Sequence, residues 1–108
     1  MRQINSKNPN GIDAKKYIKK SFGLFEYNCV DVIIKHSTSP SITKKRMNLS
    51  EILNDFDYLY ENGYICATHV IGGIAQHFMF SFKHKEKDEV VYYEFNFFKN
   101  SKIKPWIH

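Results

Sequence analysis

Large apolar side chains recur at every second position within two segments, 74–84 and 89–98, and this pattern most constrains what the chain can fold into. Successive side chains of a β-strand point to opposite faces, so each segment predicts a strand with one apolar face. The apolar face carries Ile74, Phe78, Phe80, Phe82, Val91, Tyr93, Phe95 and Phe97. A face this apolar must be covered, and we expect helices to pack on it.

A preceding segment, Tyr64–Ile71, predicts one more strand and therefore a three-stranded antiparallel meander. Gly72-Gly73 is a two-residue hairpin signal. A hairpin closed there would place Thr68 opposite His77 on the next strand.

The third strand follows a four-residue loop at Lys85–Asp88, which would place His77 opposite Asn96. The second face of the predicted sheet is mixed in polarity and could border a cleft. It carries Cys66, Thr68, His77, Met79, Ser81, Tyr92, Glu94 and Asn96.

Three helix starts share a capping signature in which Asn precedes a carboxylate by three residues. The pairs are Asn10 with Asp13, Asn28 with Asp31, and Asn48 with Glu51. They predict helices over Gly11–Phe22, Cys29–His36 and Leu49–Glu61, with a polar, basic loop over 37–47. The predicted fold class is α+β, with three N-terminal helices followed by a three-stranded antiparallel β-meander.

The length of 108 residues allows one domain. We expect a flexible N-terminus over 1–10 and a single α+β domain over 11–108. No apolar run approaches the roughly 18 residues of a membrane-spanning helix, so no membrane span is predicted. Cys29 and Cys66 have no CxxC neighbour, and we interpret both as thiols in a reducing compartment. This predicts a cytoplasmic site of action, reached by delivery into a target cell if the protein is a toxin.

Three residues form the main candidate site: Cys29, His77 and Asn96. A thiol at a helix start lies against free N–H groups, which favours the nucleophilic thiolate. His77 would accept its proton, and Asn96 would orient the imidazole, with Glu94 as the alternate orienting group. Asn28 or the backbone N–H of Cys29 would hold the oxyanion.

This order of Cys, His and Asn, with Cys at a helix start, resembles the papain-like superfamily, especially small NlpC/P60 peptidases and papain-fold toxin domains. Asn28-Cys29 resembles the start of their nucleophile helix, while Gln76–Phe80 and Val90–Asn96 resemble their His strand and the strand after it. The resemblance implies a cysteine hydrolase or acyl-transfer enzyme acting on a protein or peptide substrate. For a toxin, it also implies a cognate immunity or inhibitor protein.

The net charge of +5 leaves other functions open. Leu49–Glu61 followed by Asn62–Ile65 resembles a winged helix, which would bind nucleic acid through Lys44, Lys45 and Arg46. A small ribonuclease would use His36, His77 or Lys83 as acid–base groups. A third alternative is a non-enzymatic inhibitor or immunity-type binding protein. No cofactor and no metal site is predicted.

Overall fold

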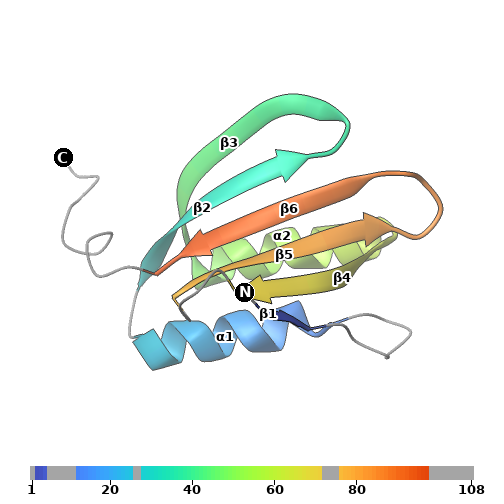
Figure 1. Ribbon diagram of the computed structural model, residues 1–108. Helices are drawn as coiled ribbons and strands as arrows, with labels where there is room; N and C mark the ends of the chain where they lie inside the picture. Colours follow the sequence, from blue (N-terminus) through green and yellow to red (C-terminus); the bar gives the residue numbers. More distant parts are fainter. Residues whose placement is uncertain (1, 5–11, 26–27, 72–75, 98–108) are drawn as a thin grey trace.

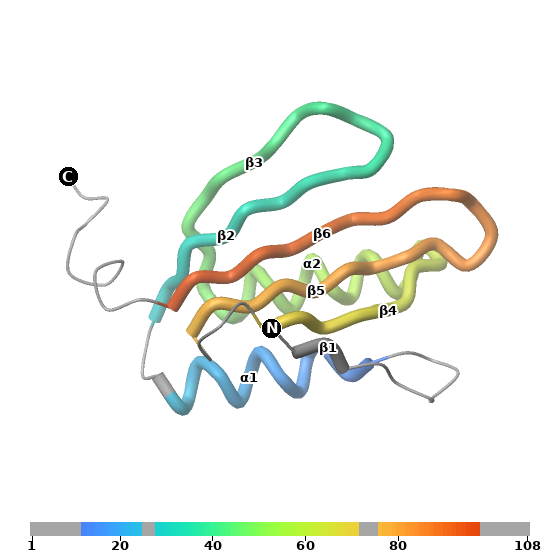
Figure 2. The backbone as a smooth tube through the Cα atoms, in the orientation of Figure 1, coloured from blue at the N-terminus to red at the C-terminus, as the bar shows by residue number. Residues whose placement is uncertain are grey.

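The computed structural model describes residues 2–4, 12–25, 28–71 and 76–97. Two helices pack on one face of a six-stranded antiparallel sheet in which one edge strand is short (Figure 1). The helices are α1 (Ala14–Phe25) and α2 (Leu49–Glu61). The strands are β1 (Arg2–Ile4), β2 (Cys29–His36), β3 (Ser39–Asn48), β4 (Tyr64–Ile71), β5 (His77–His84) and β6 (Val90–Asn96). Figure 2 follows their order across the sheet, β1-β4-β5-β6-β2-β3.

The second helix, α2, begins at the capping box that the sequence predicts. The Asn48 side chain accepts a hydrogen bond from the backbone N–H of Glu51 at 2.9 Å. The Glu51 carboxylate in turn accepts from the backbone N–H of Asn48, also at 2.9 Å. Two N–H groups that the helix leaves without partners are thereby satisfied, and the predicted span Leu49–Glu61 is confirmed.

The first helix, α1, is displaced by about one turn from the prediction of Gly11–Phe22. Asp13 rather than Asn10 caps it, because the Asp13 carboxylate accepts from the backbone N–H of Lys16 at 3.0 Å. The helix then continues through Gly23 to Phe25. Gly23 is therefore not the stop that the sequence suggests.

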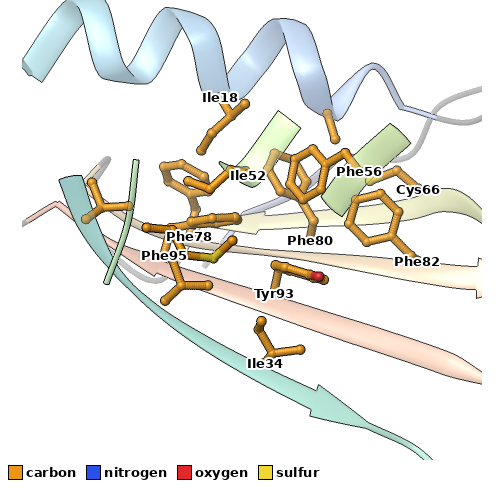
Figure 3. Packing of buried hydrophobic residues seen from close by; sticks show 14 of the residues in the cluster. Ile18, Ile34, Ile52, Phe56, Cys66, Phe78, Phe80, Phe82, Tyr93 and Phe95 are labelled. Atoms are coloured by element: carbon orange, nitrogen blue, oxygen red, sulfur yellow. The ribbon is translucent and has the colours of Figure 1, made fainter. Parts of the chain in front are cut away.

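The core lies between the two helices and the sheet (Figure 3). At its centre, the Phe56 ring of α2 has four aromatic neighbours with ring centroids 4.9–6.1 Å away, namely Phe80, Phe82, Tyr93 and Phe95. From α1, Ala14, Ile18 and Phe22 are buried at a spacing of four residues. The apolar faces of the predicted strands and helices therefore meet as expected.

Residues 29–48 form a β-hairpin, so the helix predicted over Cys29–His36 and the loop predicted over 37–47 are both wrong. Every second residue of β2 is buried, namely Val30, Val32 and Ile34. This period of two and the β-branched side chains favour a strand, and they outweigh the capping signature of Asn28 and Asp31.

Strand β4 pairs with β5 four residues away from the predicted register. Thr68 faces Ser81 rather than His77. The Gly72-Gly73 turn lies outside the described residues, but six residues (72–77) separate the paired Ile71 and Phe78. A bulge between Cys66 and Thr68 also turns Cys66 to the helix-covered face, where it is buried, so its predicted place on the mixed face is wrong.

The register of β5 and β6 agrees with the prediction. His77 pairs with Asn96, and Met79 pairs with Glu94. The β4-β5-β6 meander is nonetheless the middle of a larger sheet, because β2 and β3 extend it beyond β6. The predicted fold of three helices and a three-stranded meander is therefore corrected to two helices and six strands within the described residues.

At the N-terminus, the predicted flexible segment 1–10 contains β1, which pairs with β4, while residues 5–10 lie outside the described residues. The tail, 99–108, also lies outside them.

Candidate functional site

No described helix covers the second face of the sheet, which we call the open face. Cross-strand partners share a face, so the strand pairings identify its members. They are Cys29, Asp31, Ile33, Lys35, Ile42, Lys44, Arg46, Asn48, Ile65, Thr68, Val70, His77, Met79, Ser81, Lys83, Val90, Tyr92, Glu94 and Asn96. This face mixes cations, carboxylates and apolar side chains, whereas most of the residues buried on the helix-covered face are apolar.

A close contact between His77 and Glu94 joins β5 to β6 on the open face. His77 Nε2 lies 2.5 Å from Glu94 Oε2, and both side chains are partly buried. An ionised carboxylate can only accept, so His77 donates the hydrogen bond. The sequence named Glu94 as the alternate orienting group for His77, and this is the hydrogen bond that such a role requires.

Beside this pair lies a pocket of about 190 Å³ between β6, β2 and β3. Its lining residues are Asp31, Val32, Ile33, Lys44, Lys45, Glu94 and Asn96. Lys44 pairs with Ile33, and Ile33 pairs with Glu94, so these three side chains form one row across the sheet. The pocket therefore has an ammonium group on one side and a carboxylate on the other, with an apolar side chain between them.

The guanidinium of Arg46 contacts Asp31 at 3.4 Å on the same part of the face. Both carboxylates that line the pocket, Asp31 and Glu94, thus have a basic partner. The Lys44 side chain is exposed. A ligand that enters this pocket therefore meets an exposed cation and two carboxylates that are already paired.

Tyr92 lies next to this pocket on β6, two residues from Glu94. It pairs with Lys35 on β2 and with Ser81 on β5, which places an aromatic ring between a cation and a hydroxyl. Tyr92 is half-buried and Lys35 is exposed. The Ser81 hydroxyl is hydrogen-bonded to Thr68. An aromatic ligand stacked on the Tyr92 ring would have the Lys35 ammonium on one side and the hydroxyls of Ser81 and Thr68 on the other.

Cys29, the predicted nucleophile, is exposed at the start of β2, where it pairs with Asn48. It begins a strand, so the predicted helix N-terminus that would favour its thiolate is wrong. Strand β6 lies between β2 and β5, and His77 is level with Asp31, two residues along β2 from Cys29. Two strand spacings and two residues along the strand therefore separate the backbones of Cys29 and His77 by about 12 Å. Asn28 is exposed next to Cys29. A hydrolase that uses Cys29 as its nucleophile remains a prediction, but the helix on which that prediction was based is not present at Cys29.

The second cysteine, Cys66, is buried beneath α2 and the sheet. Burial raises the pKa of its thiol to about 12. Its Sγ–H donates to the backbone carbonyl of Thr68 at 3.6 Å. Cys66 therefore stays protonated at neutral pH and belongs to the core.

The basic residues of the winged-helix alternative, Lys44, Lys45 and Arg46, all lie on β3, at the edge of the sheet. The helix that would serve for recognition, α2, buries Ile52, Phe56 and Leu59 against the sheet. No sequence motif predicts a role for Lys35 or Tyr92. The alternation of β2 would have placed Lys35 on the face opposite to Val30, Val32 and Ile34, had that segment been identified as a strand.

A second pocket, of about 310 Å³, lies at the other end of the sheet. Its lining residues are His36, Tyr58, Leu59, Asn62, Tyr64, His84, Lys87 and Val91. His84 Nδ1 accepts from the backbone N–H groups of Glu86 and Lys87 at 3.0 Å each. His36 pairs with Val91, five residues along β6 from the partner of His77, which is about 17 Å. The two imidazoles therefore belong to different sites.

Within the described residues, no group of three or more His, Cys, Asp or Glu is placed to hold a metal ion. No helix in the same parts of the chain is long and apolar enough to cross a membrane. No family model matches the sequence, and comparisons with curated proteins and with solved structures gave no significant match.

Proposed function

We propose that this protein binds single-stranded nucleic acid on the open face of its sheet. The observation that carries the proposal is the position of Tyr92, an aromatic side chain in mid-sheet with the exposed Lys35 opposite it on the neighbouring strand. Single strands bind to such surfaces by stacking bases on aromatic rings, while basic side chains contact the phosphates.

The charges of this face support a polyanionic ligand. Lys35 and Lys44 are exposed on neighbouring strands, Asp31 forms an ion pair with Arg46, and Glu94 forms a hydrogen bond with His77. A phosphate approaching the face would therefore meet two exposed lysines, and one of the two carboxylates already has a cationic partner. The net charge of +5 adds a long-range attraction for the same class of ligand.

The shape of the face also favours a single strand. Between β4 and β3 the face is five strands wide, so the distance across is about 19 Å. Such a width suits a short run of unpaired nucleotides, within the roughly 4–16 nucleotides that sheet-based modules contact. The pocket beside Tyr92 adds polar groups of Asp31 and Asn96 that can bond to base edges.

Fluorescence anisotropy with a labelled twelve-nucleotide single-stranded RNA tests the proposal. We expect binding that weakens as salt is raised, because phosphate contacts release counterions. Replacing both Lys35 and Lys44 by Ala should lower the slope of log K against log salt by about 1.4. Tyr92→Leu, which keeps the apolar bulk and removes the ring, should weaken binding at least about fivefold.

The matched control is the double variant Lys16→Ala and Lys19→Ala. It removes the same charge from exposed positions of α1, on the helix side of the sheet. We expect a smaller change in affinity from this control than from the open-face pair. The proposal is wrong if the two double variants weaken binding equally, or if the unmodified protein does not bind the oligonucleotide at low salt.

A further inference from the structure

We infer that the open face also cleaves RNA, with Glu94 as the general base. This inference rests on the proposed function, since it assigns a reaction to the same site. It starts from the arrangement of His77, Glu94 and Lys44, which follow one another across β5, β6 and β3. A carboxylate and an ammonium group that line one pocket are suited to moving two protons during phosphodiester cleavage.

The distance between the two groups fits a phosphate. Lys44 and Glu94 lie in one row with Ile33 between them, so their backbones are two strand spacings apart, about 10 Å. Both residues line the same pocket, Lys44 from β3 and Glu94 from β6. The Lys44 ammonium can therefore contact one side of a bound phosphate while the Glu94 carboxylate faces the other.

The reaction moves two protons and exchanges one bond. Glu94 accepts the proton of a ribose 2′-hydroxyl, and the 2′ oxygen attacks the adjacent phosphorus. The bond from phosphorus to the 5′ oxygen of the next nucleotide breaks, and Lys44 donates a proton to that leaving oxygen. The products are a 2′,3′-cyclic phosphate and a free 5′-hydroxyl, and exchange with water restores both side chains. No oxidant, reductant or other co-reactant is required.

His77 is a positioning residue in this scheme. It contacts Glu94 from β5, whereas the pocket lies toward β2 and β3, and His77 is not among the residues that line the pocket. Its N–H holds one carboxylate oxygen, Oε2, and thereby fixes the orientation of the group. The other oxygen remains to face a ligand in the pocket, where Glu94 is a lining residue.

The test uses a DNA oligonucleotide with one ribonucleotide, labelled at both ends, and an all-DNA strand of the same sequence. EDTA is included to silence contaminating metal-dependent nucleases. We expect the protein to bind both strands, to cut only the first, on the 3′ side of the ribonucleotide, and to leave a cyclic phosphate that mass spectrometry identifies. Glu94→Gln should slow single-turnover cleavage at least about 100-fold. It should bind the all-DNA strand at least as tightly as the unmodified protein, because it removes a negative charge.

Glu86→Gln is the matched control, since Glu86 is exposed in the β5–β6 loop. This variant should keep both binding and cleavage. Binding of both strands without cleavage would overturn the inference and leave the proposed function in place. Absence of binding would overturn both. Cleavage that survives Glu94→Gln would show that another group, or a contaminant, performs the reaction.

Two variants of His77 test its positioning role. His77→Gln keeps an N–H donor for Glu94, whereas His77→Ala removes it. We expect His77→Ala to lower kcat with KM nearly unchanged, and His77→Gln to recover part of the loss. Equal losses in both variants, in proportion to a fall in thermal stability, would make His77 a structural residue and overturn this role.

Discussion

The buried thiol of Cys66 should make the protein lose stability at alkaline pH. Burial raises its pKa from 9.0 to about 12. The unfolded chain releases the thiol proton above pH 9, while the folded protein keeps it until about pH 12. In that window the unfolded state binds fewer protons, so the free energy of unfolding falls as pH rises. The contribution is present in full below pH 9, and at pH 10 about 1.4 kcal/mol is lost.

Urea unfolding followed by far-UV circular dichroism at pH 7 and pH 10 measures this loss. The comparison is with Cys66→Ala, which has no thiol to titrate. The variant leaves a small cavity, but that cost is the same at both pH values and cancels in the difference. Tyr93, whose pKa burial also raises, is present in both proteins and cancels as well. Burial and the charge of Cys66 both raise the pKa of Tyr60, so the comparison measures the Cys66 thiol together with its coupling to Tyr60. Equal losses of stability in the two proteins would refute the argument.

Three further predictions concern the cysteines, the cap of α2 and the core. Iodoacetamide should label the exposed Cys29 faster than the buried Cys66, and equal rates by mass spectrometry would contradict the placement of Cys66. Asn48→Ala should lower the free energy of unfolding by about 1 kcal/mol, because it removes half of the capping box; an unchanged urea midpoint would count against that role. Phe56→Ala should cost about 3–5 kcal/mol, and a loss below about 1 kcal/mol would mean that the site is not packed as described.

The alternating strands and α2 could be predicted from sequence because their signals are local. Phe78, Phe80 and Phe82 repeat with a period of two, and the short loop before Glu89 fixes the β5–β6 register. The reciprocal hydrogen bonds of Asn48 and Glu51 need only neighbouring residues. Such features depend little on the rest of the chain.

The segment 29–48 could not be assigned correctly because two local signals conflict there. Asn28 and Asp31 have the spacing of a helix cap, while Val30, Val32 and Ile34 alternate as in a strand. Pairing with β6 decides between them, since β2 contributes its apolar face to the same core. That pairing joins residues about 60 positions apart, and no local pattern reveals it.

The candidate site was predictable in part for the same reason. His77, Glu94 and Asn96 lie on strands whose register the sequence fixes, so their proximity could be foreseen. Lys44 and Lys35 join them only through β2 and β3. The helix predicted at Cys29 favoured a thiol nucleophile, and it left Lys44 in a predicted loop. The position of Lys44 in one row with Glu94 was therefore not predicted.

An NMR titration with single-stranded RNA tests the location of the binding surface most directly. Backbone amide shifts of the labelled protein are followed as the oligonucleotide is added. We predict the largest changes in β2, β3 and β6, centred on Lys35, Lys44 and Tyr92, with small changes in α1. Changes confined to the lysines of α1 would contradict the account. The absence of any change at a protein concentration of about 100 µM would also contradict it, because even non-specific binding of nucleic acid is detectable at that concentration.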